Sequence, residues 1–143
     1  MRRALWIVAL TLSAGIARAD VAPPLPDTVD GTWYGAMRQV DVKGETTYPM
    51  TVVLNGDHGS TDYPKLNCGG ELERLTSAAG GYVIYKETIT RGAFEAGKPE
   101  GCIDGIVTLH ADRDEILLGW FAAFDGEPML ASGRLSRGQF RSH

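Results

Sequence analysis

The sequence predicts an all-β protein, a small antiparallel meander barrel of about eight strands, with a β-sandwich as the alternative. Turn signals recur about every ten residues between segments with strand character. No stretch combines a helical hydrophobic period with helix caps. A meander that closes on itself also leaves no exposed sheet edge, which favours the barrel over the sandwich.

The expected strands follow one another along the chain, separated by turns rich in Gly and Asp. Their ranges are 31–40, 47–55, a short segment ending at 63, 65–75, 82–91, 102–111, 115–124 and 127–135. In two of them the alternation that marks a half-buried strand is clear. The residues that share one face are Tyr48, Met50, Val52 and Leu54 in the second and Leu66, Cys68, Gly70 and Leu72 in the fourth.

Residues 1–19 read as a secretory signal peptide. Arg2 and Arg3 precede an apolar run that is shorter than the about 20 residues of a membrane span, and Ala-Arg-Ala at 17–19 is typical of a cleavage site. We therefore expect a periplasmic or secreted protein with no membrane insertion after cleavage. A Pro-rich N-terminal arm (20–29) and a single β-barrel domain (30–143) would follow.

Charge narrows the classes of partner. Removing residues 1–19 takes away three arginines and no acid, which leaves 11 basic against 18 acidic residues and a net charge of −7. An acidic chain repels nucleic-acid phosphates and anionic membrane surfaces. A basic protein or a small-molecule ligand therefore remains as a partner, and nucleic acid does not.

Cys68 and Cys102 are the two cysteines of the chain. In an exported protein we expect them to form a disulfide that ties the fourth strand to the sixth. Closing a loop of about 35 residues would stabilise the fold by about 4 kcal/mol on the chain-entropy model. A redox pair or a metal site is the alternative, but neither cysteine has C-x-x-C spacing or a nearby histidine.

Two resemblances bear on the fold. The motifs "YPKLNCGGEL", "YKETITRG", "CIDGIVTL" and "ILLGW", within 63–120, resemble a poorly characterised bacterial extracytoplasmic β domain, which also occurs outside the membrane on some Ser/Thr kinases. That resemblance implies a disulfide-linked domain that binds something, without established catalysis. The "GTWYG" stretch, with Trp33, is similar to the calycins, where a Gly-x-Trp on the first strand plugs one end of an eight-stranded barrel.

Glu87 and Arg91 are the leading candidates for a site. If Tyr85 faces inward on 82–91, a period of two places Glu87 and Arg91 on the same side. A charge inside a barrel is costly unless it is paired or used. The two residues could bind a polar group of a ligand, together with the aromatic candidates Tyr63, Tyr85, Trp33 and Trp120.

Structural interpretations of the same residues stay open. Glu87 could satisfy buried backbone or tyrosine hydroxyl groups, or pair with Arg91, or the opposite face with Lys86 could point inward. The aromatic residues, with Phe121 and Phe124, could be plain core. The segment 115–124 is apolar on both faces, which indicates either a homodimer contact or cover by a loop or the N-terminal arm.

Signals for catalysis, metal or cofactor binding are weak. No G-x-S-x-G, H-E-x-x-H or phosphate-cradling glycine loop is present, no pair of carboxylates is singled out, and the cluster from His110 to Glu115 lacks calcium-loop spacing. We predict no catalytic residue, no metal and no cofactor.

The leading hypothesis is therefore an exported, non-enzymatic binding module that takes a small molecule or cell-wall fragment at an open barrel mouth. A protein-binding inhibitor of a basic lytic enzyme, by analogy with small-barrel lysozyme inhibitors, is the alternative, and would have a filled barrel with an acidic loop patch. An enzyme is the third hypothesis and would need perturbed titratable groups in a cleft.

Overall fold

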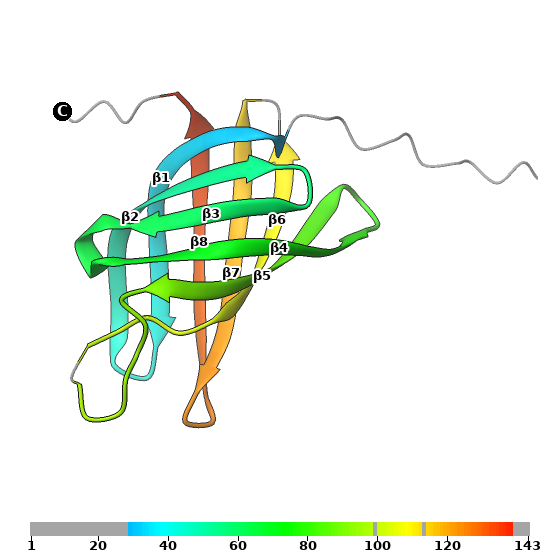
Figure 1. Cartoon of the computed structure of the whole chain (residues 1–143). Coiled ribbons are helices and arrows are strands. Elements are labelled where there is room, and N and C mark those ends of the chain that lie inside the picture. Colours follow the sequence, from blue (N-terminus) through cyan, green and yellow to red (C-terminus); the bar gives the residue numbers. More distant parts are fainter. Residues whose placement is uncertain (1–28, 99, 113, 139–143) are drawn as a thin grey trace, which may run out of the picture.

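The computed structural model describes residues 29–98, 100–112 and 114–138, which form one closed barrel of eight antiparallel strands (Figure 1). The strands are β1 (Gly31–Asp41), β2 (Gly44–Asn55), β3 (His58–Tyr63), β4 (Cys68–Ala78), β5 (Tyr82–Arg91), β6 (Gly105–Asp112), β7 (Glu115–Phe124) and β8 (Glu127–Arg137). Each strand pairs with the next, and β8 pairs with β1. The predicted meander barrel is confirmed, and the sandwich alternative is wrong.

The expected signal peptide and all but the last residue of the expected N-terminal arm lie outside the described residues. Within the described ranges, no helix has the length and apolar character needed to cross a membrane.

Two strands start later than the sequence pattern predicts. A turn of 3-10 helix, Pro64–Leu66, precedes β4 and ends at Asn67, whose φ of 54° is left-handed. Proline lacks a ladder donor and favours the first turn of a helix, so pairing begins only at Cys68. β6 begins at Gly105 because the Asp104 carboxylate, and not a paired strand, accepts the Ile89 N–H at 2.8 Å.

The interior of the barrel is filled by alternate residues of the strands. The predicted inward face of β2 is confirmed, since Tyr48, Met50, Val52 and Leu54 are all buried. On β4 the predicted face holds for Cys68, Gly70 and Leu72, whereas Leu66 lies in the 3-10 turn and is exposed. Such burial is the main source of folding free energy.

One end of the barrel is closed by aromatic side chains, and we call it the closed end. Trp33 is 0% exposed and donates its indole N–H to the Val29 carbonyl at 2.8 Å. The Arg137 guanidinium lies 4.3 Å from the centre of the Trp33 ring. Tyr85 donates to the Gly56 carbonyl at 2.9 Å, which ties β5 to the β2–β3 turn. This is the end that the Gly-x-Trp similarity predicts to be plugged.

The opposite end, which we call the open end, carries the disulfide. Cys68 and Cys102 are bonded, with their Cα atoms 6.2 Å apart. The predicted pairing is confirmed, but the bond joins β4 to the loop between β5 and β6 because β6 starts three residues after Cys102. Figure 1 shows this loop at the same end as the β1–β2 and β7–β8 hairpins.

The outer face of β7 is apolar where it meets its neighbours. Phe121 is 49% exposed and pairs with Ile106 on β6 and with Leu130 on β8, which is 55% exposed. Phe121 therefore belongs neither to the core nor to an interior pocket. A homodimer contact through 115–124 stays a prediction.

Candidate functional site

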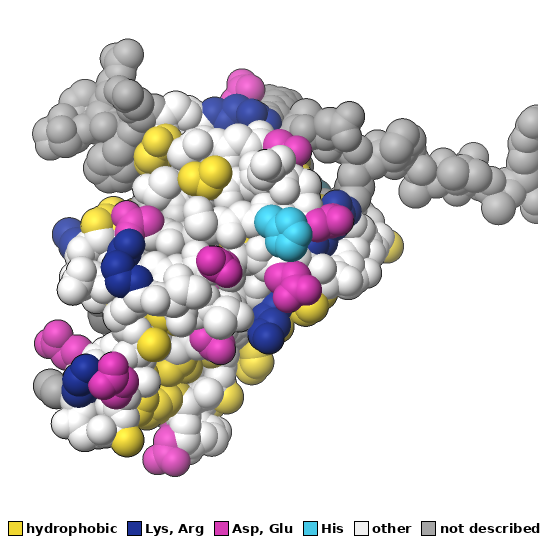
Figure 2. All heavy atoms as spheres, in the orientation of Figure 1, with side chains coloured by type: hydrophobic (Ala, Val, Ile, Leu, Met, Phe, Trp, Pro, Cys, Tyr) yellow, Lys and Arg dark blue, Asp and Glu magenta, His cyan; other side chains and the backbone are white. Residues whose placement is uncertain are grey.

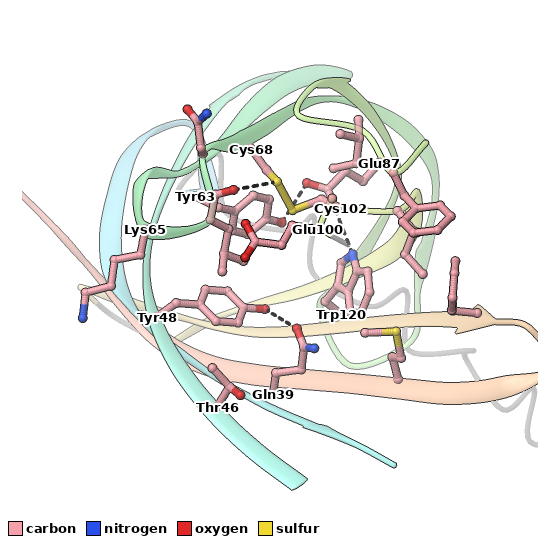
Figure 3. Close-up of a pocket in the computed structure, with 18 of the residues that line it drawn as sticks. Gln39, Thr46, Tyr48, Tyr63, Lys65, Cys68, Glu87, Glu100, Cys102 and Trp120 are labelled. Atoms are coloured by element: carbon pink, nitrogen blue, oxygen red, sulfur yellow. Dashed lines mark hydrogen bonds between the residues drawn. A yellow bond between two sulfur atoms is a disulfide. The ribbon is translucent and has the colours of Figure 1, made fainter. Parts of the chain in front are cut away.

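The open end of the barrel contains a cavity of about 620 Å³. Its wall comes from the barrel interior, and its rim comes from the β1–β2 hairpin, the 3-10 turn and the β5–β6 loop (Figure 3). The residues on which the argument depends are Gln39, Tyr48, Tyr63, Glu87, Trp120 and Met129. The size lies within the range of small-molecule sites, about 300–1,000 Å³.

Glu87 is the charged residue at the base of this cavity. Its side chain is 0% exposed, and three neutral donors bind its carboxylate. Oε1 accepts hydrogen bonds from the Thr61 hydroxyl and, at 2.7 Å, from the Tyr63 hydroxyl. Oε2 accepts one from the Trp120 indole N–H at 2.8 Å. The cluster therefore joins β3, β5 and β7 across the barrel interior.

Two glycines make room for this cluster. A Cβ atom at Gly70, on β4, would lie 3.2 Å from Glu87 Cγ and 3.3 Å from Thr61 Oγ1. The Gly70 N–H also donates to Thr61 Oγ1 at 3.1 Å, so the hydroxyl accepts there and donates to Glu87. A Cβ at Gly105 would lie 2.3 Å from Trp120 Nε1, so the indole can reach Glu87 only because residue 105 has no side chain.

Burial and hydrogen bonding shift the pKa of the Glu87 carboxyl in opposite directions. Burial raises the pKa of the Glu87 carboxyl, and hydrogen bonds from Thr61, Tyr63 and Trp120 lower it in part. The net direction is upward, with a further small contribution from the charge of Asp104. Burial and the nearby Glu87 charge also hold the pKa of Tyr63 well above its usual value, so the phenol stays a donor.

Tyr48 extends the aromatic wall from β2. Its ring packs edge-on against Tyr63, with centroids 5.9 Å apart and planes at 76°. Its hydroxyl donates to Gln39 Oε1 at 3.0 Å (Figure 3). Burial and Glu87 raise the pKa of Tyr48 to about 12. Sequence reasoning placed Tyr48 on the inward face but did not select it for the site, and it did not select Gln39 or Thr61 either.

Arg91 does not lie beside Glu87, which corrects the expectation that both face inward. The β4–β5 register pairs Ile89 with Gly70 but Arg91 with Gly69, so Thr90 is an extra residue that breaks the alternation. The Arg91 side chain is 58% exposed, pairs with Asp62 and donates to the Cys68 carbonyl at 2.8 Å. A Cβ at Gly69 would approach the guanidinium to 3.0 Å, so the glycine leaves it room.

The six predicted binding residues therefore divide between three places. Glu87, Tyr63 and Trp120 meet at the cavity. Trp33 and Tyr85 face inward but lie at the closed end, away from it, and Arg91 lies outside the barrel wall. Glu87 itself faces inward as predicted, so the opposite register with Lys86 inside is wrong, and Lys86 is exposed.

The β5–β6 loop covers one side of the mouth, is held to the barrel at two points and has backbone hydrogen bonds of its own. The disulfide ties it to β4, and the Cys102 N–H donates to the Gly92 carbonyl at 2.9 Å. The Phe94 ring packs edge-on against Phe124 of β7, with centroids 4.7 Å apart. Both phenylalanines line the cavity, so the loop contributes apolar surface to it.

The arrangement offers binding chemistry of a definite kind, an aromatic and aliphatic cavity with a buried carboxylate behind two of its rings. In the described part of the chain, no three His, Cys, Asp or Glu side chains come together as a possible metal site. No family model, curated protein or solved structure matches this chain.

Proposed function

We propose that the protein is an exported, non-enzymatic binding module that takes a small molecule in the cavity at the open end of the barrel. The observation that carries the proposal is the contrast within one barrel between a closed end filled by side chains and a cavity of about 620 Å³ at the other end. A largely apolar, partly enclosed site with a few convergent polar groups is the usual form of a ligand site.

The alternative, an inhibitor of a basic lytic enzyme, has less support. It predicts a filled barrel and an acidic patch, whereas the open end is hollow. On the face shown in Figure 2, acidic and basic side chains are interspersed and do not form one acidic patch. Several acids are also paired with arginines, as in Arg38–Glu45 and Arg134–Glu115.

Native mass spectrometry of the protein purified from the compartment to which it is exported tests this function. We expect a co-purifying small molecule that is released on denaturation. Met129→Trp, which places an indole in the cavity, should abolish it, whereas Leu130→Trp on the outer face of the same strand should not. Retention of the ligand by Met129→Trp would place binding elsewhere. A bare protein mass, together with salt-sensitive association with a basic lytic enzyme, would favour the alternative.

A further inference from the structure

The Glu87 carboxylate lies in a different environment from the carboxylates that form the described ion pairs. Those described pairs all lie at the surface and join an acid to an arginine or a lysine. Glu87 is fully buried, and none of the described ion pairs includes it. Its three partners, Thr61, Tyr63 and Trp120, are neutral donors. A buried carboxylate without a cation is expensive, so Glu87 either keeps its proton, in line with its raised pKa, or takes a cation from outside the chain.

The rings in front of this carboxylate suit a cation. Tyr63 and Trp120 donate their polar hydrogens to Glu87, and Tyr48 packs against Tyr63. A donor bonded to a carboxylate is polarised, which leaves more electron density on the ring. Electron-rich aromatic faces attract cations, and aromatic cages are the common recognition device for quaternary ammonium groups.

We propose that the ligand of this cavity is an organic ammonium compound, whose cationic group sits against Tyr48, Tyr63 and Trp120 under the influence of the Glu87 carboxylate. The proposal rests on the proposed function, since it names the ligand class of the same cavity. The ammonium group need not touch Glu87, because a charge acts over several ångströms in a medium of low dielectric.

The charges at the rim do not oppose this assignment. Lys43, Lys65 and Glu100 line the mouth, and all three are exposed, so salt and water screen them. Figure 3 shows the Lys65 side chain pointing away from the cavity. Burial raises the pKa of Glu87 in the free protein, and a bound cation would lower that pKa again, which is favourable coupling between the ligand and the carboxylate.

Three probes of nearly equal shape test the proposal: choline, 3,3-dimethylbutan-1-ol, which replaces the nitrogen by carbon, and the anion 3,3-dimethylbutanoate. Each is titrated into ¹⁵N-labelled protein expressed from the full-length chain. The indole N–H signal of Trp120 reports on the cavity, and that of Trp33 at the closed end is an internal control. We expect choline to move the Trp120 signal and to bind about tenfold more tightly than the alcohol, with the anion weakest.

Glu87→Gln removes the charge and keeps the shape, so it should bring the affinities of choline and the alcohol together. Glu71→Gln is the matched control, because Glu71 is an exposed residue on the outer face of the neighbouring strand β4 and should leave the preference intact. If Glu87→Gln does not fold, the comparison of the three probes on the unchanged protein still decides.

The outcomes separate the two proposals. If the alcohol or the anion moves the Trp120 signal at concentrations equal to or lower than choline, the ammonium assignment is overturned and the cavity still binds small molecules. If none of the probes moves it, the ammonium assignment fails, and the binding function is then decided by the native mass spectrometry of the purified protein. A preference for choline that survives in Glu87→Gln would overturn the role of the carboxylate.

Discussion

The two ends of the barrel use the same kinds of side chain for different purposes. At the closed end, Trp33 and Tyr85 donate to backbone carbonyls of the chain itself, those of Val29 and Gly56. At the open end, Trp120 and Tyr63 donate to a single buried carboxylate, that of Glu87. Neutral acceptors complete the core at one end, whereas at the other a buried carboxyl group that takes part in none of the described ion pairs stands behind a cavity. In this barrel, the acceptor of an aromatic residue's hydrogen bond therefore distinguishes the residues that complete the core from those that line the cavity.

The largest expected effect is a loss of stability at the closed end. Trp33→Ala should lower the free energy of unfolding by about 3–5 kcal/mol, because it leaves a large hole in a fully buried position. Urea denaturation followed by circular dichroism measures this loss. In the folded variant the Trp120 indole signal should keep its position. Phe121→Ala is the control, since the half-exposed outer ring loses only cross-strand contacts with Ile106 and Leu130 and should change stability by about 1 kcal/mol.

A large movement of the Trp120 signal in folded Trp33→Ala would show that the two ends are coupled through the barrel. The closed end could then no longer be treated as structure alone.

An intermediate effect is expected from Gly105→Ala at the open end. Its Cβ would lie 2.3 Å from Trp120 Nε1 and 3.0 Å from the Phe121 carbonyl oxygen, so the indole must leave Glu87 or the strands must part. We expect a loss of about 1–3 kcal/mol and a large shift of the Trp120 indole N–H signal.

Gly119→Ala is the matched control for that change. The Cβ at residue 119 would meet the Thr108 hydroxyl at 2.8 Å, on the outer face of the same strand pair, and that hydroxyl can rotate away. If Gly105→Ala leaves the Trp120 signal in place, the absence of a side chain at residue 105 is not what lets the indole reach Glu87.

The sequence predicts whether a side chain points into or out of the barrel better than it predicts how far that side chain lies from the barrel mouth. Alternation on 82–91 correctly placed Glu87 inside, because the period of two is a local property. It could not place Tyr85 and Glu87 in different environments, since the distance of a residue from the barrel mouth depends on the register of every strand. Tyr48 was missed for the same reason, because nothing local distinguishes an inward residue at the cavity from one in the core.

Arg91 was misplaced for another reason. The extra residue at Thr90 follows from how β4 and β5 pair near the disulfide, and no residue type in "TITRG" marks it. The disulfide itself was predictable from the expected export of the chain, but its end in the β5–β6 loop was not. Cys102 lies in the loop because pairing of β5 with β6 stops at Asp104, whose carboxylate accepts the Ile89 N–H in place of a carbonyl of a paired strand.

The smallest expected effect, and the sharpest test of the comparison, is the dependence of stability on pH. The groups that face Glu87 are Thr61, Tyr63, Tyr48 and Trp120, with Asp104 nearby. Among these, the tyrosines stay protonated because their pKa values are raised, so Glu87 is the member of the cluster inside the barrel that loses its proton first as the pH rises. Its pKa is raised in the folded protein above the usual 4.5, mainly by burial.

The folded protein therefore keeps this proton at pH values where the unfolded chain has lost it. The stabilisation is fully present below the unfolded pKa and is lost as pH rises through the folded pKa, with a slope of at most about 1.4 kcal/mol per pH unit. Urea denaturation at several pH values should show this decline in the protein and in Glu71→Gln, but not in Glu87→Gln. A decline that persists in Glu87→Gln would assign the titration to another group. Trp33→Ala removes a ring that donates to the Val29 carbonyl and lies near the Arg137 guanidinium, and it should lower stability by about the same amount at every pH, because it leaves the Glu87 cluster at the open end unchanged.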